Sequence, residues 1–360
     1  MKRILTSAFV IAVLGTPAFA RTTNVENPLF MPEGSHGYAS VGFGTMFKQT
    51  DNTQALQDKG WAYQDEFPIY RGYGEFGFGI LDSLAVRAKV QYTDNQEIDR
   101  RGMSDGTIGL VWRAFDGKST DGWIVDFNAD AVLGGISRLD ATVIANKPGA
   151  STPLGFDYAN YSHGRYGAWL GTRVGKTWDK FTGALFAQAQ YTFGSTNSSI
   201  KFGGDTVTLL NGMGALASSG LVADAGAQLA TMNPDFSITT KSAWEYNVGL
   251  RGFYELDEKL AFGGGFAWRS RAANVVEAVN INAGANPVVN GIVNQLKPGF
   301  MGSMHDGMNE FILSANVAYN VTETFQVVPF AEYTFASAEY RSQNGSNVKV
   351  EGGVRLNVQF

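Results

Sequence analysis

Histidine is the side chain that most often moves protons in catalysis, and this sequence of 360 residues contains three: His36, His163 and His305. Ser162 and His163 are adjacent, so in an extended strand they would point in opposite directions and could not form a nucleophile–base pair. His305 and Asp306 form one adjacent pair in a predicted loop, and a solvated polar loop explains this pair better than a catalytic site does. We therefore predict that the protein is not an enzyme.

Metal binding is the next chemistry to weigh. Met301, Met304, His305 and Met308 lie close together in the sequence and include soft ligands. Methionines in an apolar loop also serve simply to pack it, and no second cluster supports a metal. We predict no metal and no cofactor.

Charged residues occur in a more regular pattern. In the stretch Leu84 to Thr93, "LAVRAKVQYT", apolar residues alternate with a polar set that includes Arg87 and Lys89. Such alternation over ten residues predicts a β-strand with one apolar and one polar face. Residues 348–360 alternate in the same way.

Twelve segments of about the length of a tilted membrane-spanning strand, roughly 9–11 residues, follow this template. None of them carries an ionisable residue on its apolar face, which is the pattern required of a lipid-facing surface. The predicted strands are 38–48, 68–80, 84–93, 106–115, 123–134, 165–175, 181–193, 244–254, 260–270, 310–319, 325–335 and 347–360.

Composition supports export and a membrane location. Lys2, Arg3, the apolar run that follows and the small residues before Arg21 predict a secretory signal peptide over residues 1–20. The chain has no cysteine, and its charged fraction of 17% is below the ~25% of a soluble domain. A net charge of −5 argues against nucleic acid as a partner.

These features predict an all-β fold, a closed antiparallel transmembrane β-barrel of about twelve strands in the outer membrane. Short links alternate with long ones along the chain, as periplasmic turns alternate with extracellular loops in such barrels. We expect residues 21–37 to form a periplasmic lead-in and residues 38–360 to form the barrel. Residues 198–210 could hide one more hairpin, which leaves fourteen strands as an alternative.

The inner face of the predicted barrel is rich in basic residues. With Lys48, twelve basic residues point inward against seven acidic ones, and such an excess in a water-filled pore selects anions. Arg–Glu networks that brace a closed barrel are the alternative explanation, and we expect Glu75 and Lys89 to pair across their turn. The predicted lumen residues are Arg71, Arg87, Lys89, Arg113, Asp126, Asp130, Arg165, Arg173, Arg251, Arg269, Arg271, Lys349 and Arg355.

The final stretch, "VRLNVQF", resembles the assembly signal of bacterial outer-membrane proteins. In this sequence that signal would comprise Val354, Leu356, Val358 and Phe360. The resemblance implies recognition by the barrel-assembly machinery. The other partners we expect are outer-membrane lipid and small solutes.

A second resemblance concerns Ser242 to Arg271, which is similar to a strand pair of FadL-type transporters of hydrophobic compounds. The matching positions are Trp244, Trp268, Arg269 and Ser270. The apolar stretches 207–232 and 274–296 are expected to fold back, to form short helices or to contact a hydrophobic ligand. The sequence departs from that family in its twelve predicted strands, where the family has fourteen, and in a lead-in too short for the family's N-terminal hatch.

Three functions remain open at this point. The first is a passive channel for small hydrophilic solutes, with a mild preference for anions. The second is FadL-like uptake of hydrophobic compounds, and the third is a closed structural or surface-interaction barrel.

Overall fold

A computed structural model describes fourteen stretches of the chain. They are residues 24–49, 69–95, 100–103, 106–117, 122–133, 141–144, 155–156, 166–198, 200–202, 235–272, 274–282, 302–305, 308–336 and 348–360. Within them, no helix is long and apolar enough to cross a membrane.

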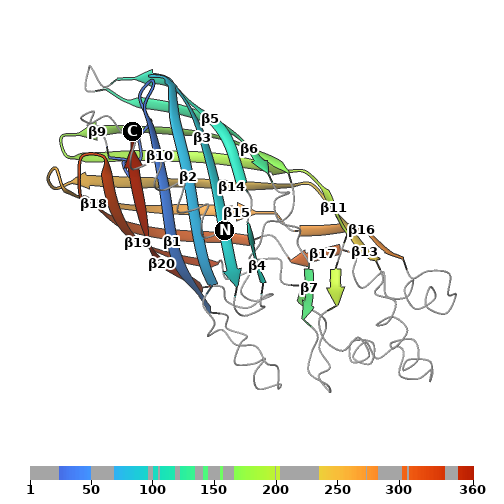
Figure 1. The fold of residues 1–360 in the computed structure, drawn as a ribbon. Coiled ribbons are helices and arrows are strands. Elements are labelled where there is room, and N and C mark those ends of the chain that lie inside the picture. The colour runs from blue at the N-terminus through green and yellow to red at the C-terminus, as the bar shows by residue number, and fades with distance from the viewer. Residues whose placement is uncertain are drawn as a thin grey trace, which may run out of the picture.

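The central feature of the fold is a closed ring of twelve antiparallel strands (Figure 1). The ring closes because β1 pairs with β2 on one side and with β20, the last strand, on the other. The barrel strands are β1 (Gly37–Gln49), β2 (Ile69–Leu81), β3 (Leu84–Asn95), β5 (Gly106–Asp116), β6 (Ile124–Leu133), β9 (Gly167–Trp178), β10 (Phe181–Thr192), β14 (Ala243–Glu255), β15 (Leu260–Arg271), β18 (Met308–Asn320), β19 (Phe325–Ala336) and β20 (Val348–Gln359).

All twelve predicted strands are therefore confirmed, with ends that differ from the prediction by a few residues. The fourteen-strand alternative is wrong. The short strands β11 (Ser195–Ser198) and β12 (Ile200–Phe202) pair outside the ring, β11 with β13 (Asp235–Thr240) and β12 with β7 (Ala141–Ile144).

The remaining short strands also lie outside the ring. β4 (Arg100–Met103) pairs with the end of β3, and β8 (Gly155–Phe156) pairs with β7. β16 (Asn274–Asn282) and β17 (Gly302–His305) complete a four-stranded sheet with β11 and β13, which extends beyond one end of the barrel (Figure 1).

The outer surface of the barrel is apolar, as the strand pattern predicted. Phe43, Leu110, Leu170 and Leu250 come from four different strands, and all are exposed. Because a soluble protein would not leave so many large apolar side chains in water, this surface fits the lipid of a bilayer. Aromatic pairs such as Trp178 with Phe181 lie near the strand ends, where interfacial girdles are expected.

The turns at one end of the barrel are short and locally bonded. In the link between β9 and β10, Asp179 adopts a positive φ of 50°. In the link between β14 and β15, the backbone N–H groups of Lys259 and Leu260 donate to the Asp257 carboxylate and hold its pKa below the ordinary value. This carboxylate therefore stays charged, and the turn stays bonded, until the pH falls below the usual range of aspartate.

A charge on the outer surface should be far more costly than one on the inner surface. Leu185 faces outward and is 62% exposed, whereas its neighbour Gln188 faces the lumen. Leu185→Arg is expected to lower the free energy of unfolding by about 2–4 kcal/mol if the residue lies near the midplane, since lipid cannot solvate the guanidinium. Gln188→Arg serves as the control. Urea unfolding in lipid vesicles would measure both, and equal losses would contradict the assignment of the two faces.

Candidate functional site

The lumen is lined by ion pairs that join neighbouring and distant strands. Glu75 and Lys89 lie opposite each other on β2 and β3 at 3.0 Å, so the predicted pair is confirmed. The other pairs are Arg71–Glu351 (2.8 Å), Arg87–Asp130 (2.5 Å), Arg113–Asp126 (2.9 Å), Arg173–Asp126 (2.5 Å), Arg269–Glu245 and Arg269–Glu310 (both 3.6 Å), Lys349–Glu310 (2.9 Å) and Arg355–Glu26 (2.9 Å). Most lumen cations of the described chain are thus matched by an acid.

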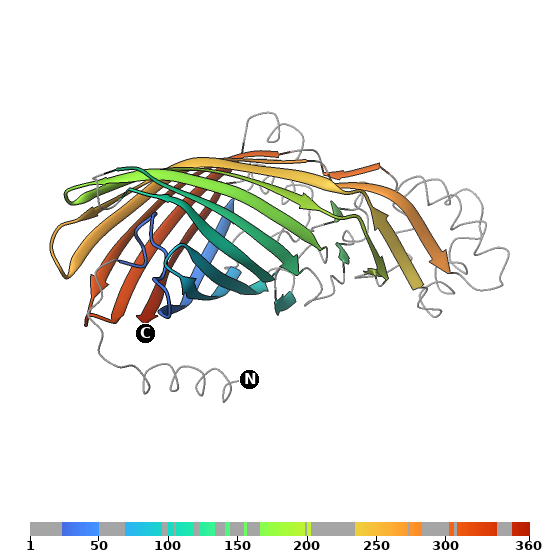
Figure 2. The same cartoon turned by 90° about the horizontal axis from the view of Figure 1, so that it is seen from above.

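The segment before β1 also enters the lumen. We call residues 24–36 the strap; it lies inside the ring of strands (Figure 2). Two of its apolar side chains are inserted against the inner wall. Leu29 is buried against Ile124 and Ala184, and Met31 is buried against Ala85 and Val111.

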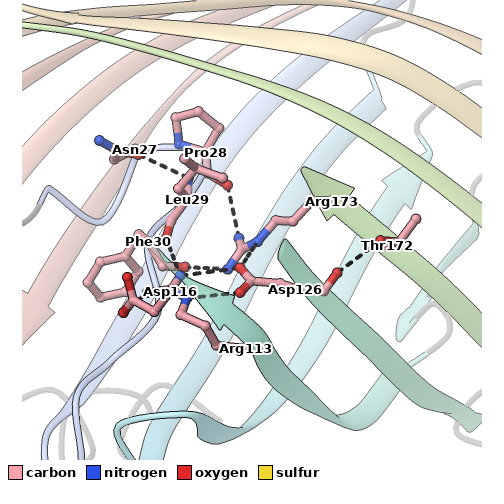
Figure 3. Close-up of polar contacts among 9 residues, drawn as sticks. All are labelled: Asn27, Pro28, Leu29, Phe30, Arg113, Asp116, Asp126, Thr172 and Arg173. Carbon is pink, nitrogen blue, oxygen red and sulfur yellow. Dashed lines mark hydrogen bonds and ion pairs between the residues drawn. The ribbon is translucent and has the colours of Figure 1, made fainter. Parts of the chain in front are cut away.

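The strap is held on one side by two arginines that share one carboxylate (Figure 3). Arg113 donates two hydrogen bonds to Asp126, and Arg173 donates a third. The remaining N–H groups of the two guanidinium groups donate to three successive carbonyls of the strap. Arg173 donates to Pro28 (3.0 Å) and Phe30 (2.8 Å), and Arg113 donates to Leu29 (2.6 Å).

In this cluster the side chains of Arg113 and Asp126 are buried, and that of Arg173 is 26% exposed. The side chains of Arg113 and Asp126 are 2% and 1% exposed, respectively. Since a buried charge without a partner is costly, Asp126 offsets the cost of placing these arginines against the inner wall. The backbone carbonyls of the strap then satisfy donors that the acid cannot reach.

On the opposite wall the strap is held by Glu26. Its carboxylate accepts hydrogen bonds from Arg355 (2.9 Å) and Asn357 (3.0 Å) of β20 and from Asn316 (2.7 Å) of β18. Asn27 adds a bond to Thr182 of β10. The strap therefore spans the lumen between walls that are distant in the sequence.

The strap leaves the lumen beside the turn between β2 and β3. Gly34 donates to the Asp82 carboxylate, and Ser35 donates to the carbonyl of Gly79. At Gly79 the strap backbone passes so close that an added Cβ would lie 2.0 Å from the carbonyl oxygen of Glu33. Glycine is needed here because any side chain would displace the strap.

The sequence predicted a lead-in for residues 21–37 and identified no contact between it and the lumen. Residues 24–36 form such contacts, while residues 21–23 lie outside the described residues. A signal was present in the sequence. Leu29, Phe30 and Met31 make an apolar cluster between Pro28 and Pro32, in a segment that has no place in the strand pattern.

The space that the strap leaves free forms two adjoining cavities in the lumen. One, of about 490 Å³, lies against the strap and is lined by Phe30, Tyr38, Tyr73 and Arg355, among others. The second, of about 270 Å³, is lined by Trp169, Phe186, Gln188 and Asn247, among others. Seven residues border both: Pro28, Arg87, Lys89, Thr107, Val111, Arg173 and Arg251.

Arg251 differs from the other lumen cations. Its guanidinium lies over the ring of Phe186, at 5.3 Å from the ring centroid. Among the lumen cations whose side chains the structure describes, it alone has no carboxylate within ion-pair distance. The sequence placed Arg251 on the inner face but could not distinguish it from its paired neighbours.

Some predicted residues cannot be placed in this way. Arg165, His163, Met301 and residues 207–232 lie outside the described residues, and for Arg271 only the backbone, in β15, is described. His36 lies in the strap, where its ring nitrogen Nδ1 contacts the carbonyl of Gly34 at 3.0 Å.

The residues that resemble an assembly signal lie at the seam of the ring, where the last strand, β20, pairs with β1. Val354, Leu356 and Val358 belong to β20 and pair with both β1 and β19. Phe360 follows β20, exchanges two backbone hydrogen bonds with Gly37, and places its ring beside Phe76. These contacts join the first and last strands of the barrel.

The apolar exterior, the closed ladder and the polar lumen define the class of protein: a transmembrane β-barrel of the outer-membrane type. The fold is similar to that of an outer membrane channel from Pseudomonas putida F1, with a TM-score of 0.52 and 12% identity over 94% of this chain and 100% of that one. The barrel formed by this chain is located in the outer membrane.

Two other solved structures are more distant. The toluene transporter TbuX of Ralstonia pickettii has a TM-score of 0.41 at 9% identity, over 92% of this chain and 90% of that one. The β-domain of the Bordetella autotransporter BrkA also has a TM-score of 0.41, at 11% identity, over 91% and 100%. At such identities the likeness concerns the fold alone. No protein-family model and no curated protein matches the sequence.

Proposed function

We propose that the protein is an outer-membrane channel through which small anionic solutes diffuse passively. The observation that carries this proposal is the pair of adjoining lumen cavities, which Arg251 borders without an acid partner. A cation that lines a water-filled path and is not neutralised by a neighbour lowers the electrostatic barrier for anions and raises it for cations.

The matched ion pairs limit how strong this preference can be. Glu26 of the strap adds an acid to the lumen that the strand pattern did not include, and it neutralises Arg355. Selectivity should therefore depend on a few residues, and Arg251 is the first of them. Arg113 and Arg173 are unsuited to a test of selectivity, because both hold the strap.

Planar-bilayer recordings of the purified barrel test the proposal. Under a salt gradient, the wild type is expected to show a reversal potential of the sign that anion selectivity produces. Arg251→Gln is expected to shift this potential toward the sign that cation selectivity produces, with little change in conductance. Lys259→Gln, which removes one charge from an exposed turn, is the matched control. A barrel that conducts neither as wild type nor with its strap released is not a channel.

We also propose that the final strand serves as the signal for the assembly machinery, on the basis of the resemblance of Val354, Leu356, Val358 and Phe360. The position of these residues at the seam supports it, because the last strand must be held until β1 reaches it. FadL-like uptake of hydrophobic compounds is the alternative. It rests on the resemblance of Ser242 to Arg271, which include β14 and β15, and on two apolar stretches: residues 207–232, which lie outside the described residues, and 274–296, described only in part.

A further inference from the structure

The smaller lumen cavity combines aromatic side chains with four cations, and the two acids that also line it, Asp126 and Asp130, are each paired with an arginine. Arg251, Phe186 and Trp169 all line it, and they come from β14, β10 and β9, which are adjacent in the ring. Its volume of about 270 Å³ lies just below the usual range of ligand cavities, roughly 300 to 1,000 Å³. A solute with one small ring is of suitable size.

The geometry around Arg251 leaves part of its guanidinium for a ligand. The Phe186 ring covers one face of the group at 5.3 Å, and no acid of the described chain forms an ion pair with it. The planar edge of the guanidinium carries N–H donors in the fork that matches a carboxylate. An anion at this edge would complete a contact that the protein itself leaves open.

The neighbouring backbone is shaped so that this arrangement can form. Phe186 lies opposite Gly249 in the ladder of β10 and β14. An added Cβ at Gly249 would lie 2.7 Å from the Phe186 ring, so the ring occupies the space that a side chain would take. The glycine thus permits the ring to lie against β14, where it meets Arg251.

The polar part of the cavity wall contains a buried hydrogen-bond acceptor without a donor in the described chain. Gln188 and Asn247 face each other across β10 and β14. The Asn247 Oδ1 atom is buried and accepts no hydrogen bond within the described chain. A buried acceptor without a donor is unfavourable, which a ligand or a water carried with it would relieve.

From these contacts we infer that the smaller cavity is a binding site for a small aromatic carboxylate, whose carboxylate pairs with Arg251 and whose ring packs beside Phe186 and Trp169. This inference deepens the proposed function and rests on it for its role in transport. The charge explains retention of an anion, and the aromatic walls explain a preference for a flat ring. A site of this kind slows one class of solute in a path that others cross freely.

Titration calorimetry on the full-length barrel in detergent tests binding without relying on conduction. Benzoate is expected to bind more tightly than acetate, which lacks the ring, cyclohexanecarboxylate, which lacks the aromatic face, and benzyl alcohol, which lacks the charge. Arg251→Gln should weaken benzoate binding about tenfold or more, since it removes a charge-assisted pair. Phe186→Leu, which keeps an apolar side chain, should weaken benzoate binding but not acetate binding.

Lys259→Gln is the control of equal charge, and heat-modifiable migration on gels confirms that each variant is folded. Equal affinity for benzoate and acetate, or unchanged benzoate affinity in Arg251→Gln, would overturn the site. The two proposals fail separately. Conduction without benzoate binding removes the site and leaves the channel, whereas benzoate binding in a barrel that does not conduct removes the channel and leaves the site.

Discussion

Replacing residues 25–31 of the strap by a glycine–serine sequence of the same length is expected to raise single-channel conductance severalfold. The replacement removes Glu26, Leu29 and Met31, which attach the strap to opposite walls of the lumen. The freed segment would no longer cross the path. Because the replacement also removes the Glu26 carboxylate from the lumen, the reversal potential should indicate stronger anion selectivity.

Two single variants refine this test. Glu26→Gln removes the charge that pairs with Arg355, and it should increase the frequency of large openings without abolishing the closed level. Glu33→Gln removes the same charge from an exposed strap residue and should leave the recordings unchanged. If the glycine–serine variant conducts like the wild type, the strap does not limit the path.

The second large effect is expected from Asp126→Asn. The change leaves Arg113, which is buried, and Arg173, which is 26% exposed, without their shared carboxylate, and breaking a buried pair such as Arg113–Asp126 costs about 3–5 kcal/mol. The free energy of unfolding should fall by that order, as measured by urea unfolding in lipid vesicles. The strap should loosen as well, because the arginines that hold its carbonyls lose their position.

Asp116→Asn is the control for this prediction. Asp116 also lies near Arg113, at 3.9 Å, but its own side chain is 40% exposed and stays solvated, so loss of its charge should cost only about 0–1 kcal/mol. Equal losses in the two variants would show that burial does not determine the strength of this cluster.

The strands were predictable from sequence because each strand is a local pattern. Alternation along β3 places Arg87 and Lys89 on the inner face whatever the rest of the chain does. The pairing of Glu75 with Lys89 was predictable too, because a short turn determines which residues of the two strands lie opposite each other.

The strap and its anchors could not be predicted in the same way. Glu26 and Arg355 are 329 residues apart, and no periodicity relates them. The strap has no regular secondary structure whose pattern could indicate a buried face. The distinct role of Arg251 depends on which neighbours lack a carboxylate, and this is a property of the closed barrel and of no single strand.

The strap is joined covalently to β1, and this connection makes it a tethered ligand of the lumen. A tether of a few residues holds a binding group at an effective concentration of about millimolar. Contacts that are weak one by one therefore suffice to keep the strap docked. A free peptide with the strap sequence would have to be supplied at a similar concentration to displace it. Release of the strap should accordingly depend on changes within the barrel itself.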